Sequence, residues 1–217
     1  MYFRQIPHAA SNNLCYLLSD PATGEAVLID AHPEQTELLC AMLAERDLQL
    51  RWLLRTHIHS ATDTCEALCS ACGAVCLSGF NGRLPHTRQI SDGDVLVFGD
   101  LIIKVIATPG HTPEALSFLC QDRLFCGDAL HPSGCPAPVD ATNAGQWFDN
   151  VTRRLFMLPG ETLVFPGHLV GGRTISTIAE ERRQNRAFGT CSRETFITEL
   201  GRNHGGIFQT AIDERKY

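Results

Sequence analysis

The sequence predicts an α/β fold in which helices cover β-sheets. Segments with strand-like and helix-like periodicity are mixed along the chain, and its middle part is rich in short apolar segments that read as strand hairpins. The chain has 217 residues, of which 44% are hydrophobic, and this is enough for one sizeable core. We therefore expect residues 1–217 to form a single domain, with a frayed tail from about residue 204.

The first part of the chain alternates between the two kinds of element. Residues 15–20 and 25–31 read as paired strands, because a turn-forming run at 21–24 separates them. Residues 33–47 follow with helical periodicity and apolar side chains along one side. Residues 48–57 then read as a buried strand that runs into a histidine.

The later segments are assigned in the same way. Residues 63–72 read as a helix that ends at Gly73, and residues 74–79 read as a strand. Apolar segments predict further strands at residues 94–100, 101–111, 115–122, 123–130 and 161–168. Helical periodicity predicts two further helices, at residues 145–158 and 175–189.

Ten cysteines is a high number for this chain. In a domain of this length without an apparent signal peptide, we expect them to be thiols and not disulfides. The densest group is Cys65, Cys69, Cys72 and Cys76, which would share one face if the whole stretch were helical. We interpret them as small buried hydrophobes, because ligands spread along three helical turns cannot converge on one ion.

Composition and charge argue against several classes of partner. The net charge of −6 comes without a basic stripe, so nucleic acid is not expected to bind. No apolar run approaches the roughly 18 residues that a membrane span needs. The N-terminal residues contain no continuous apolar core of the kind that signal peptides have, and we therefore expect a cytoplasmic protein.

Four strand-forming runs end in residues that can bind a metal ion. If these strands lie in one sandwich, the potential ligands just past their ends can meet at one edge of it. These ligands are His57, His59, His111, Asp128 and His168. Histidines two residues apart on an extended chain project to the same side, and the Pro-Gly pairs before two of the histidines make sharp turns.

These sequences resemble the motifs of the metallo-β-lactamase superfamily. The likeness rests on Thr56-His57-Ile58-His59, Thr108-Pro109-Gly110-His111-Thr112, Gly127-Asp128-Ala129-Leu130 and Pro166-Gly167-His168. Within the superfamily the chain is most similar to the persulfide dioxygenase and glyoxalase II branch, from about Phe3 to Thr198. The resemblance implies an αββα sandwich: two mixed sheets face to face, with helices on both outer faces.

The resemblance also implies a set of metal ligands. It assigns His57, His59, His111 and Asp128 to the first metal position of the superfamily. In persulfide dioxygenases two histidines and one carboxylate hold the iron, and here these would be His57, His111 and Asp128. Such a set leaves open positions on Fe(II) for a sulfur substrate and oxygen. The resemblance places His168 beside the second metal position, where it would contact water or substrate.

The first motif departs from the family pattern at the second metal position. Ala61 and Thr62 stand where the family has an aspartate and a histidine. A methyl group cannot bind a metal ion and a threonine hydroxyl is a poor ligand, so we expect one ion per chain. Fe(II) is the expected ion and zinc the alternative, since imidazole and carboxylate suit several divalent metals.

Other departures concern the substrate and the surroundings of the metal. The residues after Gly134-Cys135 include two prolines and lack the arginine of persulfide dioxygenases, and no tyrosine or lysine follows His168 to bind a glutathione carboxylate. His131 either reaches the pocket or is a surface residue. Asp30 either orients a ligand histidine or caps a turn. The sequence leaves both alternatives open.

The leading functional hypothesis is a mononuclear non-haem iron oxygenase that oxidises a low-molecular-weight persulfide, such as glutathione persulfide, to sulfite and a thiol. His57, His111 and Asp128 would hold the ion, and His168 would contribute to catalysis. One alternative is a mononuclear zinc thioester hydrolase of the glyoxalase II kind. Another is a non-catalytic member that uses the pocket for binding or sensing. The resemblance further suggests a homodimer.

Overall fold

The computed structural model describes residues 1–58, 66–80, 86–136 and 143–203, and in these residues the strands form two six-stranded sheets. The first sheet has the order β1-β2-β3-β4-β5-β6. Its strands are β1 (Tyr2–Pro7), β2 (Leu14–Ser19), β3 (Glu25–Ile29), β4 (Gln49–Leu54), β5 (Val75–Ser78) and β6 (Thr87–Gln89). The hairpins β1–β2–β3 are antiparallel, whereas β3 to β6 run parallel.

The second sheet has the order β12-β11-β10-β9-β8-β7. Its strands are β7 (Val95–Phe98), β8 (Leu101–Ala107), β9 (Leu116–Cys120), β10 (Arg123–Gly127), β11 (Leu163–Pro166) and β12 (Ser176–Thr177). Most pairs are antiparallel, but β10 and β11 run parallel, so their carboxyl ends meet at the same edge. Both sheets are therefore mixed, as predicted.

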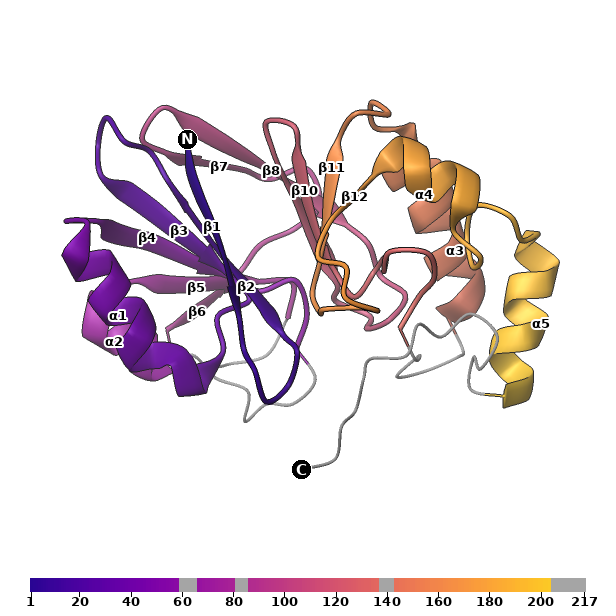
Figure 1. Cartoon of the computed structure of the whole chain (residues 1–217), viewed down its shortest axis with the longest axis horizontal. Helices are drawn as coiled ribbons and strands as arrows, with labels where there is room; N and C mark the ends of the chain where they lie inside the picture. Colours follow the sequence, from indigo (N-terminus) through magenta and orange to yellow (C-terminus); the bar gives the residue numbers. More distant parts are fainter. Residues whose placement is uncertain (59–65, 81–85, 137–142, 204–217) are drawn as a thin grey trace.

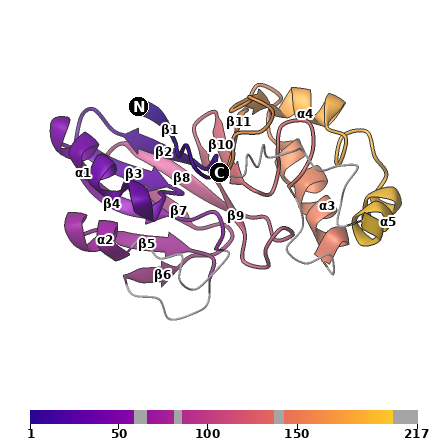
Figure 2. The ribbon, with the colours of Figure 1, turned by 60° about the horizontal axis from the view of Figure 1, so that its bottom comes forward.

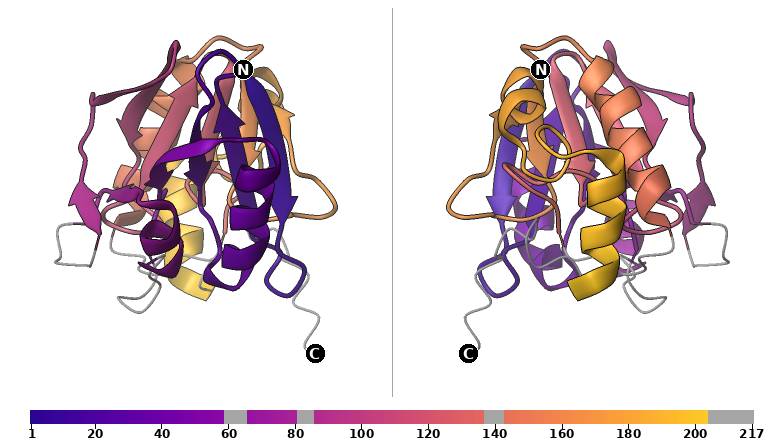
Figure 3. Two further views of the ribbon diagram at one scale, coloured as in Figure 1. Left: turned by 90° about the vertical axis from the view of Figure 1, so that its left-hand side faces the viewer. Right: turned by 90° about the vertical axis from the view of Figure 1, so that its right-hand side faces the viewer.

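The helices lie on the two outer sides of the paired sheets, which gives four layers (Figures 1 and 2). On the first sheet they are η1 (Pro33–Gln35), α1 (Thr36–Glu45) and α2 (Glu66–Cys72). On the second they are α3 (Ala144–Arg153), η3 (Leu155–Met157), α4 (Ile178–Gln184) and α5 (Arg193–Asn203). The views from the two ends in Figure 3 show purple helices in front of one sheet and orange and yellow helices in front of the other. This is the predicted αββα arrangement.

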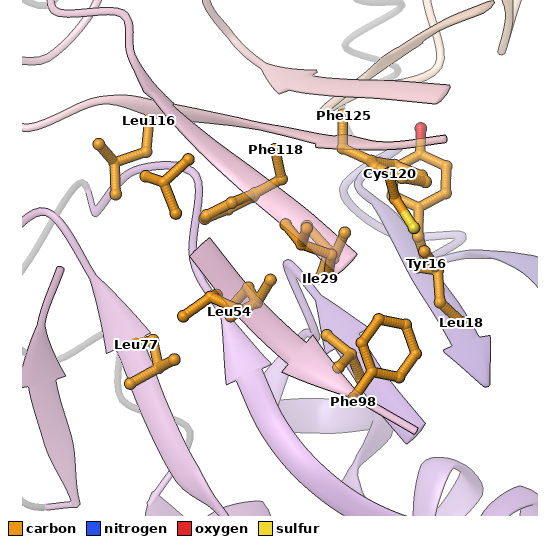
Figure 4. Close-up of a cluster of buried hydrophobic side chains, with 14 of the residues drawn as sticks. Tyr16, Leu18, Ile29, Leu54, Leu77, Phe98, Leu116, Phe118, Cys120 and Phe125 are labelled. Carbon is orange, nitrogen blue, oxygen red and sulfur yellow. The ribbon is translucent and has the colours of Figure 1, made fainter. Parts of the chain in front are cut away.

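Three apolar clusters separate these layers. The central cluster lies between the sheets, where labelled side chains such as Leu54 from the first sheet and Phe118 from the second point toward one another (Figure 4). A second cluster lies under α3 to α5 and contains the fully buried Trp147. The third lies under α1 and α2. In β7 and β8 buried and exposed residues alternate, as expected for strands with one face on the core.

The structure differs from the sequence predictions at several places. β1, β6, β12 and α5 were not predicted, and the predicted helix at 145–158 is α3 followed by the separate η3 turn. The predicted helix at 175–189 is shorter than expected: Ser176–Thr177 form β12, and α4 spans Ile178–Gln184. By contrast, the helix end predicted at Gly73 and the strand predicted at 74–79 are confirmed, so the four cysteines do not share one helical face. The helix ends at Cys72, where Gly73 has a φ of +64°, and Cys76 lies in β5. Cys69 and Cys76 are nevertheless buried among apolar side chains, as expected, whereas Cys65 and the predicted tail from residue 204 lie outside the described residues.

None of the helices in the described part of the chain is both long enough and apolar enough to cross a membrane.

Candidate metal centre

Segments that follow four strands bring the predicted ligands to one edge of the sandwich. His57 follows β4 of the first sheet, and His111, Asp128 and His168 follow β8, β10 and β11 of the second sheet. The backbone N–H of Leu116 donates to the carbonyl of Thr56 at 2.7 Å and so joins the two sheets beside this edge. The remaining predicted ligand, His59, lies outside the described residues.

The carboxylate of Asp128 is the centre of the group. Its Oδ2 lies 3.8 Å from Nε2 of His57 and 3.6 Å from Nε2 of His111. Its Oδ1 lies 2.8 Å from Nδ1 of His168 and 3.2 Å from Nε2 of His131. The two carboxylate oxygens therefore face different pairs of imidazoles, and the ligand atoms within each half lie within 4.8 Å of one another.

Asp30 and Thr56 fix the orientation of His57 and its protonation pattern. The Thr56 backbone N–H and hydroxyl both donate to the Asp30 carboxylate, each at 2.8 Å. The hydroxyl oxygen also lies 2.9 Å from Nδ1 of His57. Because the hydroxyl has only one hydrogen and donates it to Asp30, Nδ1 of His57 must be the donor in this contact. When the ring is neutral, the form in which it can bind a metal ion, the lone pair then lies on Nε2, the atom that faces Asp128.

Two glycines allow the backbone to approach the centre closely. Gly127 has a φ of +51°, and a Cβ there would lie 2.2 Å from Oγ1 of Thr56. A Cβ at Gly167 would lie 2.6 Å from Oδ1 of Asp128. Real Cβ atoms do not come this close to other heavy atoms, so both positions require glycine. The Pro-Gly and Gly-Asp pairs of the sequence therefore reflect steric demands of the site.

Trp147 of α3 supports the loop that carries His111. Its indole Nε1 donates to the carbonyl of Ala129 at 2.8 Å, and its ring centroid lies 6.0 Å from that of His111. A Cβ on Gly110 would lie 2.2 Å from Cγ of this tryptophan. Asn150, one helical turn later, donates through Nδ2 to the carbonyl of Pro109 at 2.7 Å. Helix α3 thus holds the His111 loop by packing and by a hydrogen bond.

Replacing Trp147 by alanine is expected to lower the free energy of unfolding of the metal-free protein by about 3–5 kcal/mol, because it removes a fully buried indole and leaves a cavity. Urea denaturation followed by circular dichroism measures this change. Met157→Ala is the control, since the Met157 side chain is 75% exposed and its loss should change stability by less than about 0.5 kcal/mol. Equal effects of the two substitutions would contradict the assigned role of Trp147.

The surrounding imidazoles determine the charge state of Asp128. Burial alone would raise its pKa, but the charge of His57 and the hydrogen bonds from His131 and His168 outweigh burial and hold the pKa well below its usual range. Burial would likewise lower the pKa of His168, but the hydrogen bond and the charge of Asp128 outweigh this and raise the pKa. The centre therefore contains a carboxylate that stays ionised and can bind a cation.

Asp30 has the opposite shift. Removal from water raises its pKa to about 6, and the partly compensating effects are the charge of Arg55 and the hydrogen bonds from Thr56. It lines a cavity of about 140 Å³ together with Arg55, His57 and His168. His32 and Pro33 form another part of the cavity wall. The cavity reaches the metal centre, because His57 and His168 belong to both.

The donor set fits a divalent metal ion. His57, His111 and Asp128 supply two imidazole nitrogens and one carboxylate oxygen, the combination that suits Fe(II), Zn or Mn. Of the two open alternatives in the sequence, Asp30 orients His57 through Thr56, and His131 is completely buried against Asp128. The sequence left open whether His131 reaches the pocket, since its only signal there is its place three residues after Asp128.

Two relatives decide the family. The chain is 34% identical over 207 residues to the persulfide dioxygenase ETHE1, mitochondrial, of Homo sapiens, and this match covers 91% of the chain and 80% of the human protein. A crystal structure of ETHE1 from Myxococcus xanthus matches with a TM-score of 0.86 and 41% identity, covering 93% of this chain and 91% of that one. The chain belongs to the persulfide dioxygenase and glyoxalase II branch of the metallo-β-lactamase superfamily.

Other comparisons agree with membership of this branch. The hydroxyacylglutathione hydrolase of Rhodospirillum rubrum is 36% identical over 165 residues, which is 73% of this chain and 62% of that protein. No protein-family model matches the chain. Membership of the branch, together with the cluster of imidazoles and carboxylate, indicates that the protein works with a metal cofactor.

Proposed function

We propose that this metallo-β-lactamase-fold protein is a persulfide dioxygenase that uses one Fe(II) ion held by His57, His111 and Asp128. The observation that carries the proposal is the grouping of these three side chains at the sheet edge, in a chain related to the ETHE1 proteins over most of its length. Two neutral imidazoles and one carboxylate hold Fe(II) while leaving positions for other ligands. His59 remains a predicted neighbour of this set.

The proposed reaction converts glutathione persulfide, oxygen and water into glutathione, sulfite and two protons. In it the outer sulfur is oxidised, the S–S bond breaks, and oxygen is the electron acceptor. The iron would supply the binding and activation of oxygen that amino-acid side chains cannot provide. The protein residues would orient the persulfide and hold the metal-binding side chains in place.

The arrangement of the cavity supports these roles. His168 lies at the cavity wall with Nδ1 on Oδ1 of Asp128, where its ring can contact substrate or water. Arg55 lies on the same wall and brings positive charge toward an anionic persulfide. Residues 137–142, which include part of the loop that differs from persulfide dioxygenases, lie outside the described residues. The thiol carrier, a homodimer and a cytoplasmic location remain predictions.

A zinc thioesterase is the second candidate, because hydroxyacylglutathione hydrolases are among the relatives of the chain. Hydrolysis through a hydroxide bridging two ions needs ligands at both metal positions. Ala61 and Thr62 stand in the motif where the second position would need an aspartate and a histidine. A hydrolytic role would therefore have to proceed with one ion, and this makes the oxygenase the better supported function.

Anaerobic purification followed by metal analysis and oxygen-uptake measurements tests the proposal. We expect about one iron per chain and an oxygen consumption that depends on added glutathione persulfide, with sulfite as the product. Zinc-loaded protein that cleaves S-lactoylglutathione without consuming oxygen would support the hydrolase instead. Metal-loaded protein inert to both substrates would exclude both enzymes and leave the non-catalytic alternative.

A further inference from the structure

We infer that His131 is a positioning residue that holds one oxygen of the Asp128 carboxylate, so that the other oxygen faces the proposed iron position. Nε2 of His131 lies 3.2 Å from Oδ1, and Nδ1 of His168 lies 2.8 Å from the same atom. Oδ2 faces the other two imidazoles. The inference rests on the metal centre of the proposed function and not on the reaction that the centre performs.

The direction of both hydrogen bonds follows from the chemistry of the groups. An ionised carboxylate only accepts hydrogen bonds, so a ring nitrogen at hydrogen-bond distance from Oδ1 must donate. His131 and His168 then place two N–H groups on one oxygen. Rotation of the carboxylate would break both contacts. Oδ1 is therefore held in place. Oδ2 then faces His57 and His111 already before a metal ion binds.

Helix α4 and Asn185, the residue that follows it, hold the turn that contains His131 in place. Nδ2 of Asn185 lies 3.0 Å from the carbonyl oxygens of both His131 and Gly134 and 2.7 Å from Oε2 of Glu181, so its two N–H groups are shared among three acceptors. The same Oε2 accepts the backbone N–H of Ser133 at 2.9 Å. Asn185 and Glu181 are both buried, so these bonds are shielded from water. The turn at 131–134 is thereby tied to α4, and the direction of the imidazole is set.

The same three groups could instead hold a second ion, because their ligand atoms lie within 4.8 Å of one another. Two observations favour the hydrogen-bonded arrangement. His131 is 0% exposed, so water has no access on its side to complete a coordination shell. Ala61 and Thr62 also remove the two ligands that the family supplies at the second position. His131 thus acts on the side of Asp128 opposite to the first ion and helps to keep the centre mononuclear.

Metal affinity of His131 variants tests this inference without any enzymatic assay. We compare His131→Leu, which cannot donate, with His131→Gln, whose amide can, in apoprotein titrated with Co(II) and Fe(II) against a competing chelator. His131→Leu is expected to weaken binding about 10–100-fold, as losses of outer-shell partners do. His131→Gln is expected to recover most of the affinity and the wild-type visible spectrum of bound Co(II). His86→Asn, an exposed histidine replaced at a φ of +55°, is the control and should match the wild type.

Three outcomes would overturn the inference. Unchanged affinity in His131→Leu would remove the positioning role, and equal losses in the leucine and glutamine variants would show that donation is not what matters. Two ions per wild-type chain, falling to one in His131→Leu, would make His131 a ligand. Thermal unfolding of the apoproteins shows whether the variants fold. Wild-type protein that binds metal in the expected way but consumes no oxygen with persulfide would defeat the proposed function and leave this inference intact.

Discussion

His111→Ala is expected to leave the purified protein almost free of iron and to abolish persulfide-dependent oxygen uptake. The substitution removes one of three ligand side chains, and the remaining imidazole and carboxylate cannot hold the ion against solvent. The loss of affinity should exceed the roughly 10–100-fold that is typical of an outer-shell partner. Iron content by elemental analysis and oxygen uptake by electrode, both on anaerobically prepared protein, measure the effect.

The fold of this variant has to be checked separately, because His111 is buried beside Trp147. Circular dichroism and the thermal unfolding of apoprotein serve this purpose, and His86→Asn controls for loss of a histidine remote from the centre. A folded His111→Ala protein with the iron content of the wild type would show that the proposed ligand set is wrong. A protein that keeps iron but loses activity would indicate that His111 contacts the substrate and does not bind the metal ion.

Asp30→Asn is expected to weaken metal binding about 10–100-fold through a change of tautomer at His57. In the wild type the Thr56 hydroxyl donates to Asp30, so Nδ1 of His57 carries the hydrogen and Nε2 the lone pair. An asparagine amide can donate to the Thr56 oxygen in place of the accepting carboxylate. The hydroxyl is then free to donate to His57 Nδ1, and the hydrogen moves to Nε2, the atom that has to bind the ion. Chelator competition at pH 7.5 measures the affinity.

The same substitution should have the opposite effect on the stability of the apoprotein. The folded-state pKa of Asp30 is raised to about 6 from 3.8, so the folded protein keeps this proton to higher pH than the unfolded chain. Stability is therefore lost as pH rises from about 4 to 6, by on the order of 3 kcal/mol, and this contribution stays constant above that range. Asparagine cannot ionise, and its left-handed φ of +52° is tolerated at this position.

Urea denaturation of metal-free wild type and Asp30→Asn, at several pH values between 4 and 8, tests this expectation. The difference in unfolding free energy should grow in favour of the variant up to about pH 6 and then level off. Thr56→Val is a matched variant, because it also breaks the contact to His57 but leaves the Asp30 carboxylate. It should weaken metal binding without the pH-dependent gain in stability. Equal metal affinity in wild type and Asp30→Asn would refute the tautomer argument.

The sequence predicts those parts of the centre that are visible in short stretches of neighbouring residues. A strand-forming run that ends in a ligand is visible at His57, His111, Asp128 and His168, and the structure places all four at one sheet edge. The sandwich itself was predicted by its resemblance to the family motifs and by the alternation of strands and helices. Both predictions use information carried by a few neighbouring residues.

The parts that were missed or left open depend on contacts between distant residues. His131 reaches Asp128 because Asn185, 54 positions later, binds its carbonyl, and no local pattern reveals such a bond. The terminal strand β1 has intermediate or exposed residues at most positions, so it lacks the apolar run that identifies a buried strand. The predicted helix at 175–189 failed at its start, because Ser176 and Thr177 pair with β11 and form β12.

The ligands come from both sheets, and this has a consequence for how the protein matures. His57 belongs to the first sheet and Asp128 to the second, while the last predicted catalytic residue follows β11 at position 168. A growing chain cannot complete the site until that late strand has paired with β10 and the two halves have closed. Metal binding would then be a late step of folding, and each bound ion would link two sheets that are otherwise held together by apolar packing and by hydrogen bonds such as the one from Leu116 to Thr56.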